Sequence, residues 1–367
     1  MTPLPKVAEQ LAPVDSPSEQ PLVFFETMRD NFERAAEGSG EIVERFYSIG
    51  GYCVRLQFAG RAMVELLTSA FAHLRIEPQS HFDLSVGLWD SASTNTYLPP
   101  PPWAPADCLP RCSVRDYVNS RIQVSYESVK KILSVLDIES NQGYFWIRDA
   151  AQLPAYQCGS PLLVLLHQWM AQNNRMLVHG GAVGTPEGGV LLVGKGGSGK
   201  STATLCCLDS PLMYAADDYG LVGSEPEPYF YSLYSSGKVN APDVSKHPII
   251  ASAQHSAILD TQKALYFLHS YFPEKISKGF PLRAIIVPRV TPQIETRVRR
   301  IGQAQAMLAL APSTLFQLPG AEAEKFGRMG ALVKSLPAYA LESGSDWKQI
   351  PRVLGELIAE LNGKATG

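Results

Sequence analysis

The sequence lacks an excess of charge of either sign. Its 32 Lys and Arg residues stand against 35 Asp and Glu residues, for a formal net charge of −3. Proteins whose main partner is nucleic acid or an anionic membrane carry a clear basic patch or excess. The near balance therefore argues against both partners. The 45% hydrophobic content indicates a globular chain with a core of its own.

Long apolar runs are also missing. No segment approaches the roughly 20 apolar residues that a helix needs to cross a bilayer. Residues 1–20 contain scattered prolines and no apolar core, so they predict a disordered tail and neither a signal nor a transit peptide. We therefore expect a cytoplasmic protein that does not contact a membrane.

Cysteine is scarce, with six residues in 367. Cys108 and Cys112 resemble half of a metal site, but no second pair of ligands at metal spacing follows them. We expect reduced thiols, as is usual in the cytoplasm.

Alternating patterns predict α/β structure in the first half of the chain. Residues 52–58 and 82–88 alternate apolar and polar side chains, as half-buried strands do, and residues 62–74 repeat apolar side chains at helical spacing. Strand, helix and strand in this order predict an N-terminal α/β domain over residues 21–160. The prolines of residues 99–102 predict an extended loop, interpreted as a surface linker in preference to a ligand for an aromatic groove.

A second domain is predicted over residues 161–367, and no internal repeat is evident. Residues 162–170 predict a short apolar helix, residues 175–183 a strand, residues 185–189 a turn, and residues 189–193 a buried strand. Residues 284–287 predict another buried strand, and the basic residues 297–300 a solvated face.

A glycine-rich motif follows the strand over residues 189–193. Residues 194–201, GKGGSGKS, fit the pattern G-x-x-x-x-G-K-[ST] in full. Glycines allow successive backbone N–H groups to converge on phosphate oxygens. Lys200 is predicted to reach the β- and γ-phosphates and Ser201 to ligate Mg²⁺, while a helix from Lys200 to about Leu208 points its positive end at the same anion. The predicted nucleotide-binding residues are Gly194, Gly196, Gly197, Ser198, Gly199, Lys200, Ser201 and Thr202.

Two adjacent acids and a histidine are the candidate catalytic groups. Asp217 and Asp218 end a short apolar stretch about 17 residues after Lys200. Two carboxylates at a strand end can have different roles, one near a metal and one near an acceptor hydroxyl. His179 lies on the strand before the phosphate-binding strand, which predicts that it is close to the phosphates. Alternatively, the acids form a solvated turn or a helix cap, and His179 is a satisfied core residue.

Taken together, residues 179–180, the motif VLLVGKGGSGKST and residues 216–218 resemble the catalytic domain of the HPr kinase/phosphorylase family. They are more similar still to the smaller HPr-kinase-related serine kinases, including those that modify peptides in natural-product clusters. The resemblance covers about residues 162–222, with a weaker similarity of layout over residues 233–238, 284–288 and 337–341.

The resemblance implies an α/β P-loop kinase core of the HPr-kinase and phosphoenolpyruvate-carboxykinase type. It implies that Asp217 is the general base, that Asp218 orients the site or touches the metal, and that His179 lies close to both. The family's later glutamate signature is not found, so the resemblance does not extend to phosphorylase activity. The N-terminal region matches no HPr kinase motif, which argues against HPr as the substrate.

The sequence thus predicts an ATP- and Mg²⁺-dependent kinase with catalytic residues Asp217, Asp218, His179 and Lys200, and with Ser201 and Asp218 at the metal. The expected acceptor is a serine of a peptide or protein, and a homo-oligomer is possible. The alternatives are a kinase of a sugar or another small alcohol, and a non-catalytic nucleotide-binding protein. Lys238, Arg283 and Arg289 are further candidates for neutralising phosphate charge. Arg289, at the end of a buried strand, is favoured among them.

Overall fold

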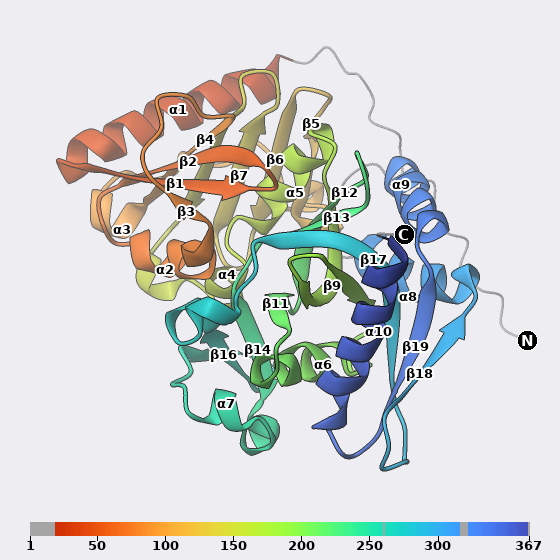
Figure 1. Ribbon diagram of the computed structural model, residues 1–367. Helices are drawn as coiled ribbons and strands as arrows, with labels where there is room; N and C mark the ends of the chain where they lie inside the picture. Colours follow the sequence, from red (N-terminus) through yellow and green to blue (C-terminus); the bar gives the residue numbers. More distant parts are fainter. Residues whose placement is uncertain (1–18, 260, 316–321, 366–367) are drawn as a thin grey trace, which may run out of the picture.

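The computed structural model describes residues 19–259, 261–315 and 322–365 (Figure 1). Within these ranges the chain is a mixed α/β protein whose strands form three sheets. Apart from Glu19 and Gln20, the tail expected over residues 1–20 lies outside the described residues. Every helix in the described ranges is too short or too polar to cross a bilayer.

The first sheet has eight strands in the order β3-β1-β2-β4-β8-β7-β6-β5. Its centre is parallel, because β2 pairs with β4 and β4 with β8 in the same direction. The crossover from β2 to β4 runs through the helix expected over residues 62–74, which divides into α2 (Val64–Thr68) and a 3₁₀ segment (Ser69–Leu74). The strands are β1 (Ile42–Ile49), β2 (Tyr52–Ala59), β3 (Arg75–Ile76), β4 (Leu84–Asp90), β5 (Ser113–Val118), β6 (Ile122–Glu127), β7 (Ile132–Asp137) and β8 (Gln142–Ile147).

An aromatic layer joins the first sheet to helix α1 (Gln20–Ser39), which lies along its outer side in Figure 1. The proline segment at residues 99–102 is an extended loop, as expected. It is more than a surface linker, however, because the adjoining Trp103 is buried. The Trp103 ring centroid lies 5.0 Å from that of Phe24 and 5.0 Å from that of Tyr117. The loop is thus fixed to the sheet by its aromatic residue.

The second sheet is built around β9 (Met176–Thr185) and β17 (Gly279–Val290), in the order β10-β9-β12-β13-β17-β19-β18. The first half of β9 pairs with β12 and its second half with β10, across the turn expected at residues 185–189. Short β11 also pairs with β9, and β10 with β17. The other strands are β10 (Gly188–Val193), β11 (Met213–Ala216), β12 (Tyr219–Gly223), β13 (Tyr229–Ser232), β18 (Arg297–Ile301) and β19 (Ala338–Ser343).

Helices cover both faces of this second sheet. Helices α6 (Lys200–Cys206) and α10 (Gln349–Ala365) pack on one face, and α8 (Gln303–Leu315) and α9 (Glu322–Ser335) on the other. A third sheet, β14 (Ser236–Asn240), β16 (Lys263–Phe267) and β15 (Ala257–Ile258), lies beside α6. The remaining α-helices of the described ranges are α3 (Ser91–Thr94), α4 (Ala155–Gly159), α5 (Leu163–Gln172) and α7 (Pro248–Ala251).

One apolar cluster spans the predicted boundary at residue 160. It includes side chains of the first sheet, of α5, and of Leu177, Leu221, Leu233 and Tyr234 from the second half. The Tyr234 ring lies 5.3 Å from Phe71, and its hydroxyl donates to the Pro161 carbonyl at 2.8 Å. The two halves therefore share a core, and the division into two domains stays a prediction.

Candidate functional site

The glycine-rich loop connects β10 to α6, and α6 begins at Lys200 as expected. Gly194, Gly197 and Gly199 have φ angles of 151°, 78° and 100°, which L residues rarely adopt. A Cβ on Gly194 would meet the Ser198 Oγ at 2.8 Å. The loop's path therefore requires glycine at these positions.

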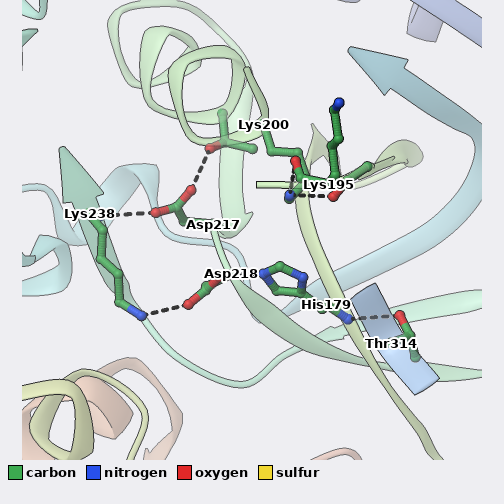
Figure 2. A network of polar contacts seen from close by, with 9 residues as sticks. His179, Lys195, Lys200, Asp217, Asp218, Lys238 and Thr314 are labelled. Carbon is green, nitrogen blue, oxygen red and sulfur yellow. Dashed lines mark hydrogen bonds and ion pairs between the residues drawn. The ribbon is translucent and has the colours of Figure 1, made fainter. Parts of the chain in front are cut away.

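The ammonium group of Lys200 lies inside this loop. Its Nζ donates to the Gly194 carbonyl at 2.6 Å and to the Lys195 carbonyl at 3.3 Å (Figure 2). The residue is 7% exposed. Burial lowers the pKa of Lys200, and the charges of Asp218 and Asp217 oppose this shift. A buried cation whose partners are two neutral carbonyl groups is stabilised by an anion, because a buried charge is costly when it is not paired.

Asp217 lies in the bend between β11 and β12 and is 2% exposed. One carboxylate oxygen accepts the backbone N–H of Lys238 at 2.9 Å, and the other faces the Thr204 hydroxyl at 3.5 Å. Burial and the neighbouring Asp218 raise the pKa of Asp217, against the opposing effects of a hydrogen bond from Ser201 and the charge of Lys238. This carboxyl therefore takes up a proton more readily than an ordinary aspartate.

The surroundings of Asp218 lower its pKa, whereas those of Asp217 raise it. Its Oδ1 is 2.7 Å from His179 Nε2, and its Oδ2 is 2.5 Å from Lys238 Nζ (Figure 2). Burial would raise the pKa of Asp218, but the Lys238 charge and the bond to His179 hold it well below its usual range. Asp218 is a carboxylate fixed between two basic side chains.

Gly180 and Gly181, which follow His179, allow the acid-bearing bend and helix α6 to lie against β9. The Gly180 N–H donates to the Asp218 carbonyl at 3.0 Å, which ties the acid-bearing bend to β9. A Cβ on Gly181 would lie 2.4 Å from the Thr204 Cγ2, so only glycine lets α6 pack directly on β9. The backbone N–H of His179 donates to the Thr314 hydroxyl of α8 at 3.2 Å.

A cavity of about 490 Å³ opens beside the acids. Its lining residues come from the first sheet and the segment after it, from helix α6, and from the third sheet and the segment before β16. A second cavity of about 510 Å³ lies at the end of α1, but none of the network residues lines it. The cavity beside the acids is lined by Lys130, Gln152, Pro154, Ala155, Tyr156, Ser201, Asp217, Asp218, Lys238, Leu259, Thr261 and Lys263.

No family model matches the sequence, and no curated protein matches it. Among solved structures, the Hpr(Ser) kinase/phosphatase from Coxiella burnetii is similar to this chain at a TM-score of 0.29 and 11% sequence identity. The similarity covers 52% of this chain and 99% of that one. A TM-score this low carries no argument about function.

The structure brings Lys200, Ser201, Asp217, Asp218 and His179 into one neighbourhood, although their chemical roles stay predictions. Thr202 lies half-buried in the first turn of α6. A Cβ added to Gly196 or to Gly197 would meet no atom within 4 Å, so both glycines border open space.

Of the three further basic candidates, Lys238 is the one that contacts the acids. Arg283 instead pairs with Glu227 at 2.8 Å and donates to the Glu187 carbonyl at the β9–β10 turn. Arg289 is exposed. Its neighbours Pro288 and Val290 are the residues that approach Gly199, and side chains alternate along a strand, so Arg289 points away from the loop.

Sequence reasoning missed the cavity residues contributed by the first half of the chain. Lys130 and Tyr156 precede the glycine-rich loop by tens of residues and belong to no motif. Their place beside Asp217 follows from how the first sheet packs on the second, for which the sequence has no local signal.

Proposed function

We propose that this chain is an ATP- and Mg²⁺-dependent phosphotransferase that transfers the γ-phosphoryl group to a hydroxyl, expected to be a serine of a peptide or protein. One arrangement supports this above the others: Ser201, which directly follows the buried Lys200 of the glycine-rich loop, lines one cavity together with Asp217 and Asp218, whose pKa values are shifted in opposite directions. A module that merely binds nucleotide has no need of a carboxyl with a raised pKa beside an open cavity.

The loop residues fit a triphosphate. Gly194, Gly197 and Gly199 have positive φ angles, and the Ser198 hydroxyl is buried without a hydrogen-bond partner in the described part of the chain. The Lys200 ammonium would neutralise the β- and γ-phosphates. Ser201 would hold Mg²⁺, which, when bound, offsets the charge that builds up on the phosphate oxygens during transfer.

Asp217 is proposed as the general base for the acceptor hydroxyl. It lines the cavity, and its raised pKa brings it closer to the value that favours proton transfer near neutral pH. Asp218, engaged on both oxygens by His179 and Lys238, is proposed to orient the site. Because Ser201 hydrogen-bonds to Asp217, the competing role for Asp217 is at the metal.

Asp217→Asn tests the proposal, since it keeps the shape of the side chain and removes its basicity. Transfer of phosphate to an acceptor identified by mass spectrometry should fall about 10²- to 10⁴-fold. A loss at the low end also fits, because a loose transition state needs little early help from a base. ATP affinity, measured by calorimetry, should be retained because Lys200 and Ser201 are unchanged.

The matched control is Asp243→Asn, at a half-buried acid outside the cavity lining that pairs with Lys246. It should leave both measurements unchanged. Wild-type transfer by Asp217→Asn would exclude the base role. Loss of ATP binding, or a steeply increased Mg²⁺ requirement, would assign Asp217 to the metal instead.

A further inference from the structure

We propose that the cavity beside the acid pair takes an acceptor that carries an anionic group, a carboxylate or a phosphate, next to its reactive hydroxyl, and that Lys130 and Lys263 bind this group. The inference rests on the proposed kinase function and adds the chemical class of its acceptor.

The cavity has the size and position of an acceptor site. Its volume of about 490 Å³ lies within the range of roughly 300–1,000 Å³ typical of small-molecule pockets. Ser201 and Asp217 line it, so an acceptor inside it would lie beside both the phosphate loop and the base. Lys130 comes from the turn between β6 and β7, and Lys263 begins β16.

The cavity lining contains more lysines than acids, three against two. Lys238 is engaged by Asp218 at 2.5 Å, and Asp217 accepts the backbone N–H of Lys238 at 2.9 Å. Among the described residues, Lys130 and Lys263 form no ion pair. The nearby acid Glu127 is hydrogen-bonded on both oxygens by the Tyr156 hydroxyl, at 2.8 and 2.7 Å.

Two unpaired ammonium groups at the edge of a cavity favour an anion there. A lysine ammonium is a compact point charge that can pair with a carboxylate or a phosphate from several directions. A charge-assisted hydrogen bond of this kind contributes about 1.5–3 kcal/mol, or roughly tenfold or more in affinity. An acceptor without an anionic group would leave the exposed Lys130 and the half-buried Lys263 to water.

Lys263 has one competing role. It lies near enough to Lys200 for its charge to affect that lysine. In this competing role, Lys263 would contact the γ-phosphate of the nucleotide and not the acceptor. Lys130 and Lys263 must therefore be tested separately.

The first experiment uses pyridoxal 5′-phosphate, an anionic aldehyde that forms an imine with lysine amines and is trapped by borohydride. The full-length protein is labelled with and without a saturating non-hydrolysable ATP analogue and Mg²⁺, and the modified lysines are mapped by mass spectrometry. We expect Lys130 and Lys263 to be labelled at least tenfold more than Lys131, an exposed neighbour on the same turn, with the nucleotide present. Labelling no stronger than that of Lys131 would overturn the inference.

The second experiment compares matched acceptors at saturating ATP and Mg²⁺: glycerate with glycerol, and the peptide acetyl-Ala-Ser-Asp-amide with acetyl-Ala-Ser-Ala-amide. In at least one pair the anionic member should have a kcat/KM at least about tenfold higher. The pair that responds distinguishes a small hydroxy acid from an acidic peptide. Equal rates within both pairs, or no product from any probe by a protein that binds ATP, would overturn the inference and leave nucleotide binding intact.

Variants assign the preference to residues. Lys130→Gln and Lys263→Gln should each reduce the anionic preference about tenfold, with the KM for ATP unchanged, while Lys131→Gln, which makes the same change of charge outside the cavity lining, should not. A raised KM for ATP with an unchanged preference in Lys263→Gln would assign that lysine to the nucleotide and contradict its part of the proposal. Failure of the wild type to bind ATP would instead refute the proposed function itself.

Discussion

Asp217 and Asp218 are neighbours in the sequence, yet their surroundings shift their pKa values in opposite directions. Asp217 points into the packed side of α6, where few positive groups offset its burial. Asp218 points the other way, between His179 and Lys238. One dipeptide thus holds a carboxyl with a raised pKa next to a carboxylate with a lowered pKa.

Lys238→Met should move the pH dependence of phosphoryl transfer. The wild-type rate should fall as pH drops through the raised pKa of Asp217, because the base must be ionised. The charge of Lys238 lowers the pKa of both acids, so removing it should shift this acidic limb to higher pH. The backbone N–H of residue 238 still reaches Asp217 in the variant.

The measurement is kcat/KM for the acceptor across pH, with ATP saturating. Lys246→Met, at an exposed lysine on the segment after β14, is the matched control and should leave the limb in place. An acidic limb that does not move in Lys238→Met would show that Asp217 does not control it.

Lys200→Ala should abolish nucleotide turnover. Its ammonium is the charge that the loop itself holds at the phosphate position, and the bonds to the Gly194 and Lys195 carbonyls fix it there. Lys195→Ala is a suitable control, because Lys195 belongs to the same loop but is exposed. ADP release measures the effect, and full turnover by Lys200→Ala would refute the assignment of the loop.

At the scale of elements, the site depends on how closely α6 approaches β9. Gly181→Ala should destabilise the fold by about 1–3 kcal/mol, because the new Cβ would lie 2.4 Å from the Thr204 Cγ2. Thr204→Ser removes that methyl group and keeps the hydroxyl that faces Asp217. The double variant should therefore recover most of the loss.

Urea unfolding of the wild type, both single variants and the double variant measures this coupling. Gly196→Ala, where a Cβ would meet nothing within 4 Å, is the control for the alanine substitution itself. Additive losses in the double variant would mean that the contact between Gly181 and Thr204 does not limit the approach of α6.

Elements with a local pattern could be predicted from the sequence, and contacts between distant segments could not. The strand at residues 189–193, the loop and the helix starting at Lys200 are contiguous, so composition and spacing determine them. The strand position of His179 predicted that it lies near the glycine-rich loop, whereas its place near the acids was implied only by the resemblance, because that contact depends on the pairing of β9 with β12. Lys238 was one of three basic candidates, among which the sequence favoured Arg289, and its place at the acids depends on β14 packing beside α6. Lys130 reaches the cavity through the packing of two sheets, which no local period encodes.

At the scale of the whole molecule, the cavity lies where the two halves meet, so its shape depends on their relative position. The shared apolar cluster fixes that position: Leu233 and Tyr234 of the second half are buried among side chains of the first sheet and α5. A hinge between the halves would have to break this cluster. The cavity and the shared core are therefore parts of one structural unit.

This predicts that the chain unfolds in a single cooperative transition. Four of the five tryptophans, Trp89, Trp103, Trp146 and Trp169, lie in the first half or in α5, and Trp347→Phe removes the fifth. In that background, Leu332→Ala should destabilise the protein by about 2–5 kcal/mol. Leu332 is 2% exposed in a cluster built from the second half, away from these tryptophans.

If the unit is cooperative, the midpoint measured by tryptophan fluorescence should fall together with the midpoint measured by far-UV circular dichroism. Leu233→Ala, which removes a side chain from the shared cluster itself, should lower both midpoints in the same way. A fluorescence midpoint that Leu332→Ala leaves unchanged while the circular dichroism midpoint falls would show that the halves unfold separately. The contacts of Leu233 and Tyr234 would then be too weak to hold the cavity in one shape.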